Sequence, residues 1–392
     1  MSITRLASRP IPSKYAASIM HLGKRLLSVQ RRKFNVYAPL KSRLCHPTFD
    51  VFYAHPPIPY SIYLPKCISH CINYIPYWQI LTSRLYSPAF VVEFVDHPAS
   101  LLNSFGHNHE ISSFRASELI KSTTGRMRDL GIKGFIFQHI RQKEFFDFLY
   151  PFLSSCPYVI APLAFPKYCE AHIQTRANSG PCTFLCIATD FYAKGLPLLL
   201  KAWSLLSDTH KNGCSLVIVT PEVPREYYSY LTHSSISLRI LKRKLSLSEK
   251  INLYQNCDCF VNLALTDSGI SAEALSFGLP IISTKLLSTD MYVDNNNGFV
   301  LNTPLTFYGT EPLSFYSSYE KFLASYHKLL ENGGFNDLIL SIRDSIIKAL
   351  NKDLLSTMSI NSLSKYNKNF CAHVRNNRVL QFYNNVISGK ML

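Results

Sequence analysis

Short apolar runs alternate with amphipathic stretches through the second half of the chain. Uninterrupted apolar segments at Thr183–Ala188, Leu216–Val219 and Cys259–Leu263 predict strands that are buried on both faces, as in a parallel sheet. Between these segments, Leu196–Leu206 and Ser246–Asn256 have the apolar spacing of helices. Strands that alternate with helices predict an α/β fold with doubly wound parallel sheets.

The first half of the chain shows the same alternation. Strands are predicted at Phe49–His55, Phe90–His97, Gly134–His139 and Cys156–Pro162, with helical spacing between the last two. A histidine at the carboxyl end of a central parallel strand is placed for a cleft. His97 is therefore the first candidate for a functional histidine and His55 the second, and a purely structural role is the alternative for each.

The most informative stretch runs from Leu265 to Asn302. An apolar strand is followed by a turn, by a helix from about Ile270 and by a Gly278 and Pro280 stop signal, after which a second buried strand begins. A strand-to-helix turn of this kind directs backbone N–H groups outward, which suits a phosphate or a sugar hydroxyl. Glu273 lies about one turn into the helix, where its carboxylate could accept from two neighbouring hydroxyls.

Glu273–Ser283 resembles the signature of GT-B glycosyltransferases of the retaining, nucleotide-sugar-dependent type, the glycosyl transferases of group 1 or family 4. Asn295–Val300 resembles the turn that follows this signature, and Lys194 with Gly195 resembles the end of the element that binds the donor diphosphate. The resemblance implies an α/β fold of GT-B architecture, with two Rossmann-like domains facing a central cleft. It also implies transfer of a hexose-type sugar from a nucleotide sugar to an acceptor hydroxyl, with retention.

The same resemblance assigns roles to individual residues. Lys194 would neutralise the donor diphosphate, Glu273 would hold the donor ribose, and His97 would contact the sugar. The residues expected to bind the donor are Lys194, Ser268, Gly269, Ile270 and Glu273, and those expected to be catalytic are His97, Lys194 and Asp267. The expected enzyme needs no metal and no cofactor, because the nucleotide sugar is a co-substrate.

Two positions differ from the family pattern. Leu265 stands where the family has a first glutamate, eight positions before Glu273, and Thr189 stands where it has an arginine. Asp267 is the nearest acid to the missing glutamate. These differences leave an alternative open, which is a degenerate GT-B protein that binds a nucleotide sugar or a partner without turnover.

The length of 392 residues favours two domains. The polar segment Gln174–Pro181 has the composition of a linker. We therefore expect an N-terminal, acceptor-side Rossmann-like domain over residues 1–178 and a nucleotide-sugar domain over 179–365. By resemblance, residues 366–392 form a helix that returns to the first domain.

The composition of the chain indicates which classes of binding partner to expect. The chain has 41 Lys and Arg against 25 Asp and Glu, a net charge of +16, which favours polyanions such as phosphorylated donors or anionic lipid head groups. A nucleic-acid partner is not expected, since no nucleic-acid module is recognisable. The 11 cysteines are scattered, without zinc-site spacing, and no apolar run approaches the ~20 residues of a membrane span. We expect a cytoplasmic protein, peripheral on the inner face of a membrane if its acceptor is a lipid-linked glycan.

Overall fold

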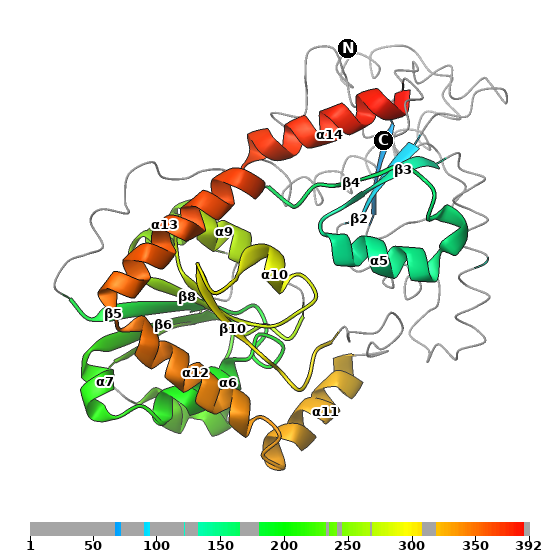
Figure 1. Cartoon of the computed structure of the whole chain (residues 1–392). Coiled ribbons are helices and arrows are strands. Elements are labelled where there is room, and N and C mark those ends of the chain that lie inside the picture. Colours follow the sequence, from blue (N-terminus) through cyan, green and yellow to red (C-terminus); the bar gives the residue numbers. More distant parts are fainter. Residues whose placement is uncertain are drawn as a thin grey trace, which may run out of the picture.

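The computed structural model describes residues 67–71, 90–94, 121, 132–164, 180–232, 235–240, 245–266, 269–307 and 319–387. Its strands form two sheets, one of four strands and one of six (Figure 1). The predicted α/β class is confirmed, and the two separate sheets are those expected of GT-B architecture. His55 and His97 lie outside the described residues.

The larger sheet is parallel throughout and has the strand order β10-β9-β8-β5-β6-β7. Its strands are β5 (Cys182–Ile187), β6 (Cys214–Thr220), β7 (Ile236–Ile240), β8 (Cys259–Asn262), β9 (Ile281–Thr284) and β10 (Gly298–Leu301). These bounds agree with the apolar runs in the sequence. The first strand, β5, lies in the interior, because the chain builds the sheet outward from it in both directions.

Helices cover both faces of this sheet (Figure 1). They are α6 (Leu196–Ser204), α7 (Asp208–Asn212), α8 (Leu247–Gln255), α9 (Ile270–Ser276), α10 (Thr289–Tyr292), α11 (Tyr319–Glu331), α12 (Asn336–Ala349) and α13 (Lys352–Asn369). Phe184 of β5 packs into a core with α6, α11 and α12, and its neighbour Leu185 packs into a second core with α8, α9 and α13. Successive side chains of a strand point to opposite faces, so a sheet covered on both sides requires the continuous apolar runs observed.

The smaller sheet has the order β1-β2-β3-β4. Its strands are β1 (Cys67–Cys71), β2 (Phe90–Phe94), β3 (Ile132–Phe137) and β4 (Tyr158–Ile160). The pairs β2–β3 and β3–β4 are parallel, whereas β1 is antiparallel to β2, which the sequence pattern did not predict. Helix α5 (Ile140–Leu149) packs Phe146 on Phe135 and Phe137, and Pro151 begins a separate short helix, η2 (Pro151–Leu153).

The last two helices connect the sheets. Helix α13 packs on α9, and α14 (Ala372–Ile387) packs on β3 and β4, where Val379 and Phe382 join the core around Ile136. A Cβ atom at Gly134 would lie 2.6 Å from the Phe382 ring, so glycine permits this close approach. These contacts are the ones that a returning C-terminal helix needs, although the domain limits at residues 178 and 365 remain predictions.

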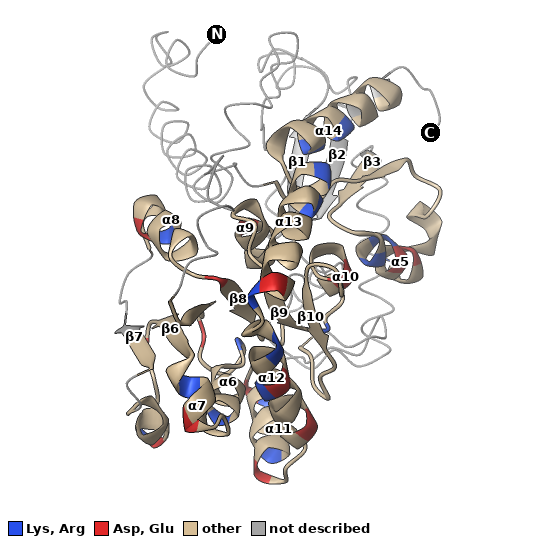
Figure 2. Cartoon of the chain, turned by 60° about the vertical axis from the view of Figure 1, so that its left-hand side comes forward, with Lys and Arg blue, Asp and Glu red and all other residues tan. Residues whose placement is uncertain are grey.

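Charged residues of both signs are mixed on α5, α11 and α12 (Figure 2). On α14, by contrast, the charged residues are the basic Arg375 and Arg378. Among the helices that the structure describes, none has the length and hydropathy required to cross a bilayer.

Candidate functional site

The larger sheet has one point at which its strand order reverses, between β5 and β8. From β5 the chain proceeds to β6 and β7 on one side, and then crosses back to β8, β9 and β10 on the other. In open parallel sheets, ligands bind at the carboxyl ends of the strands at such a point. The loop that leaves β5 there is residues 188–195, and the chain that leaves β8 continues through Leu263 to Thr266. The first loop carries Lys194, and Gly269, Ile270 and Glu273 lie at the start of α9 and in its first turn.

Lys194 lies where these two loops meet. Its Nζ donates to Thr266 Oγ1 at 3.3 Å, and the Leu265 N–H donates to the Ala193 carbonyl oxygen at 2.8 Å. Burial raises the pKa of the nearby Cys186 thiol to about 12, and the Lys194 charge opposes that shift. A cation is thus held in the loop that follows β5, and its role at a diphosphate stays a prediction.

Gly195 permits the loops to approach so closely. Its φ is +69°, and a Cβ atom there would lie 2.4 Å from the Leu263 carbonyl oxygen. Asp190 also shapes this loop, because one of its oxygens accepts from the Ala193 N–H at 2.7 Å and the other from the Tyr319 hydroxyl. The position of Lys194 is therefore fixed by its neighbours.

Glu273 points its carboxylate toward α8. Lys250 Nζ donates to its two oxygens at 2.8 and 2.9 Å, and the Tyr254 hydroxyl donates to Oε2 at 3.1 Å. The Glu273 side chain is only 6% exposed, whereas that of Lys250 is 32% exposed. Neither Lys250 nor Tyr254 belongs to the sequence signature. The structure therefore reveals two partners of Glu273 that sequence reasoning did not predict.

The start of α9 is fixed against the end of β8. Asn262 Nδ2 donates to Ser271 Oγ at 2.8 Å, and Gly269 is the N-cap residue, without a side-chain cap. Gly269 and Ile270 are partly exposed there. Ser268, which we expected to bind the donor, and Asp267 lie outside the described residues.

The two departures from the family pattern differ in their surroundings. Leu265 is 0% exposed and belongs to the core that packs against α6 and α12. Thr189 is exposed at the end of β5. The residue in the place of the first glutamate therefore fills the core, and the residue in the place of the arginine supplies a hydroxyl without a charge.

Two tyrosines near this site are held by carboxylates. The Tyr192 hydroxyl donates to Glu226 at 3.0 Å, and the Tyr319 hydroxyl donates to Asp190. Burial, and then these hydrogen bonds, raise the pKa of both tyrosines far above the ordinary value. Both therefore stay protonated and act as donors that tie η4 (Arg225–Leu231) and α11 to the loop of Lys194.

Sequence reasoning did not select His139 as a candidate, although it predicted a strand that ends there. His139 is buried and is the N-cap residue of α5, two residues after β3 ends. Strand β3 is parallel to β2, which ends at Phe94, three residues before His97. The available signal was the same for both histidines, namely a polar residue just after an apolar strand.

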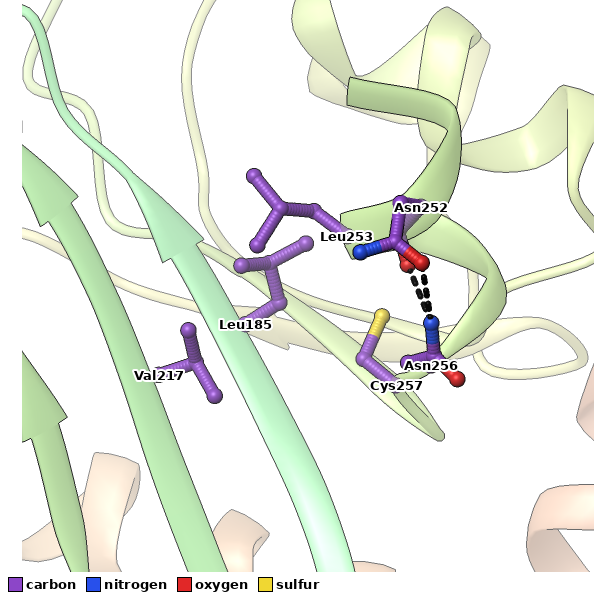
Figure 3. Close-up of a pocket in the computed structure, with 6 residues that line it drawn as sticks. All are labelled: Leu185, Val217, Asn252, Leu253, Asn256 and Cys257. Carbon is purple, nitrogen blue, oxygen red and sulfur yellow. Dashed lines mark hydrogen bonds between the residues drawn. The ribbon is translucent and has the colours of Figure 1, made fainter. Parts of the chain in front are cut away.

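A small cavity lies elsewhere, between the middle of the sheet and α8 (Figure 3). It measures about 160 Å³ and has a floor of Leu185 and Val217. Asn252 and Asn256 are at its side, where Asn256 Nδ2 donates to the Asn252 side chain at 2.8 Å. Pockets for small ligands measure roughly 300 to 1,000 Å³, so this cavity is too small for a nucleotide sugar.

A metal centre was not expected from the sequence. Within the described ranges, no three His, Cys, Asp or Glu side chains gather as a metal site would require. Because His97 and Asp267 lie outside those ranges, metal independence stays a prediction.

Comparison with known families gives one match. The family model described as glycosyl transferases group 1 matches residues 170–305, which is less than half of the 392 residues. This segment contains both Lys194 and Glu273. The match confirms the resemblance over these residues. The comparison with curated proteins gives no match.

Several solved structures are similar in part. The crystal structure of a GtfA/B complex is 15% identical, with a TM-score of 0.47, over 69% of this chain and 48% of that one. WaaG, a glycosyltransferase involved in lipopolysaccharide biosynthesis, is 15% identical, with a TM-score of 0.43, over 63% and 61%. A UDP-forming α,α-trehalose-phosphate synthase from Burkholderia xenovorans is 11% identical, with a TM-score of 0.46, over 74% and 66%. This chain thus spans about half of the first relative and about three fifths of the second, and TM-scores below 0.5 carry no argument about function.

Proposed function

We propose that this chain transfers a sugar from a nucleotide-sugar donor to an acceptor hydroxyl, with retention of the anomeric configuration. One observation carries the proposal. The family-matched segment carries Lys194, in the loop that follows β5, and Glu273, in the first turn of α9, the helix that follows β8, and the switch point of the larger sheet lies between β5 and β8. A cation and a carboxylate at this point suit the diphosphate and the ribose of one donor.

The chemistry asked of these residues is mainly electrostatic. As the bond between the sugar and the diphosphate breaks, negative charge grows on the leaving nucleoside diphosphate and positive charge grows on the sugar. Lys194 would stabilise the leaving diphosphate, and Glu273 would hold the ribose so that the donor keeps one orientation. We assign contacts with the transferred sugar to His97 and Asp267, and diphosphate contacts to the N–H groups of Ser268, Gly269 and Ile270.

The finer assignments belong to the same proposal. The enzyme is a hexosyltransferase-type glycosyltransferase that needs no metal, because Lys194 supplies the charge that a divalent cation would otherwise supply to the diphosphate. The acceptor is a glycan or a lipid-linked glycan, and the protein works in the cytoplasm.

If the acceptor is lipid-linked, we propose that the protein binds the surface of an anionic membrane. Support comes from the net charge of +16 and from Phe148 and Phe152, which are 61% and 69% exposed at the end of α5 and in η2. Flotation with liposomes tests this proposal. Equal recovery of the protein with anionic and with neutral vesicles would exclude it.

A degenerate protein that binds a nucleotide sugar or a partner without turnover is the second candidate. The buried position of Leu265 and the uncharged Thr189 favour it. Each lost group of this kind costs roughly 2 to 4 kcal/mol of transition-state stabilisation. Binding without release of the nucleotide would be its signature.

A screen with UDP-, GDP-, ADP- and CMP-sugars, with chelator present, tests both candidates. Thermal stabilisation by one donor, together with slow release of its nucleotide, supports the transferase. Stabilisation without release, even with glycan acceptors added, supports the degenerate protein. If no donor stabilises the chain, the transferase is wrong, and of the second candidate only the form that binds a partner remains.

Two variants test the site itself. Glu273→Ala should weaken donor binding about tenfold or more, the loss of about one charge-assisted hydrogen bond. Glu331→Ala, at the exposed end of α11, is the control and should bind as the unmodified protein does. Unchanged affinity in Glu273→Ala would remove this residue from the donor site.

A further inference from the structure

Lys250 stands beside the proposed donor-binding carboxylate, although no sequence motif selects it. It lies in the first half of α8, and its Nζ reaches both oxygens of Glu273, 23 positions further along the chain. Tyr254, one turn later on the same face of α8, donates to Glu273 Oε2. The two residues thus engage one carboxylate from one helix face.

The local structure holds both donors firmly. A complete capping box begins α8, in which Ser246 Oγ accepts from the Glu249 N–H and the Glu249 side chain accepts from the Ser246 N–H. The Tyr254 ring is fully buried and stacks on Phe277 with ring centroids 4.9 Å apart. The position of the Glu273 carboxylate is therefore set by α8 as well as by its own helix.

Counting acceptor sites shows what this network leaves for a ligand. A carboxylate offers about four lone-pair sites, two on each oxygen. Lys250 engages both oxygens of Glu273 and Tyr254 engages Oε2, so about one site, on Oε1, remains for a ligand hydroxyl. The carboxylate cannot accept from two ribose hydroxyls while this network is intact.

Lys250 can supply the second contact. An ammonium group has three N–H donors, and two of those of Lys250 serve Glu273. At 32% exposure, the Lys250 side chain lies at the rim of the site, whereas the Glu273 side chain is almost fully covered. A hydroxyl pair that approaches Glu273 Oε1 from solvent therefore meets Lys250 as well.

We propose that Lys250 is a ligand-binding residue, and that it reads the two hydroxyls of a ribose jointly with Glu273. Glu273 Oε1 accepts from one hydroxyl, and Lys250 Nζ donates to the oxygen of the other. The inference rests on the proposed donor site, because it takes the ribose of a nucleoside diphosphate as the ligand. It adds a residue from α8 to that site and gives the two hydroxyls different partners.

Binding of a nucleoside diphosphate and of its 2′-deoxy and 3′-deoxy analogues, measured by calorimetry, tests the proposal. The nucleoside diphosphate carries the base of the donor that stabilises the protein in the screen described above. Lys250→Met keeps most of the side-chain length and removes all three donors. We expect it to bind the ribonucleotide about tenfold more weakly, the loss of about one charge-assisted hydrogen bond. It should bind one of the two deoxy analogues as well as the unmodified protein does, because that analogue lacks the hydroxyl that Lys250 contacts.

Other outcomes overturn the proposal. Equal weakening for all three ligands would mean that Lys250 acts on the diphosphate charge, and equal affinities in variant and unmodified protein would mean a purely structural ion pair. Circular dichroism checks the fold of each variant. If Lys250→Met does not fold, Lys250→Leu, which also removes all three donors, takes its place under the same criteria. Lys328→Met, at an exposed position of α11, is the matched control.

Failure of the proposed function would give a different result. If the unmodified protein binds no nucleoside diphosphate at all, the donor site itself is wrong, and the role of Lys250 falls with it. If the unmodified protein binds and discriminates between ribose and deoxyribose, but Lys250→Met discriminates in the same way, only the role of Lys250 is wrong.

Discussion

Introducing a glutamate at residue 265 tests whether the core position of this residue excludes it from the site. Leu265 occupies the place of the first family glutamate, yet its side chain is 0% exposed and packs in the core. Its backbone is fixed as well, since its N–H donates to Ala193 and its carbonyl oxygen accepts from the Phe307 N–H at 2.7 Å. Leu265→Glu should therefore place a carboxyl group in the core rather than beside the donor sugar.

The expected cost has two parts. Removing the buried leucine side chain costs about 2 kcal/mol of apolar burial. Burying a carboxyl group without a partner costs about 1 to 3 kcal/mol even when it takes up a proton. The free energy of unfolding should thus fall by about 3 to 5 kcal/mol, a large fraction of the 5 to 15 kcal/mol typical of a folded protein.

Urea unfolding followed by circular dichroism measures this change. Leu265→Met keeps the volume and should cost less than about 1.5 kcal/mol. Leu340→Glu places the same charge at a leucine that is 40% exposed on α12, and it should change stability by no more than about 0.5 kcal/mol. If Leu265→Glu is as stable as Leu340→Glu and accelerates nucleotide release, the residue faces the site and the structural argument is refuted.

Two further changes test the loop of Lys194 and the packing of α13. Gly195→Ala should destabilise the protein by at least about 1 kcal/mol in urea unfolding, because a methyl group would meet the Leu263 carbonyl oxygen and the φ of +69° disfavours alanine; unchanged stability would contradict this backbone geometry. Burial raises the pKa of Asp294, but its hydrogen bond and ion pair with Lys365 at 2.7 Å outweigh burial and lower it below the ordinary 3.8. A depressed pKa in the folded state gives stability that is present above pH 3.8 and is lost as the pH falls through the folded-state value. Asp294→Asn should therefore lower stability at neutral pH by less than about 1 kcal/mol, since the pair is partly exposed. The gap between variant and unmodified protein should close as the pH falls below the folded-state pKa of Asp294, and a gap that stays the same over the whole acid range would contradict the pairing.

The local elements of the larger sheet follow from the order of apolar and polar residues along the chain. Apolar runs of strand length and amphipathic runs of helical spacing predicted β5, β6, β8, α6 and α8 to within two residues at each end, because these patterns depend on neighbours in the chain. The signature around Glu273 and the Lys194–Gly195 pair depend on the same local order. A family model could match them for that reason.

Which of these residues contact one another depends on how distant elements pack. Lys194 and Thr266 are 72 positions apart, and Lys250 and Glu273 are 23 apart, so their contacts exist only because β5 pairs with β8 and α8 packs beside α9. Tertiary packing also places the Leu265 side chain in the hydrophobic core. Periodicity along the sequence shows which residues prefer burial. It does not show which groups a buried side chain contacts, because these come from elements distant in the sequence. Glu273 therefore has two partners on α8, Lys250 and Tyr254, that no sequence motif contained.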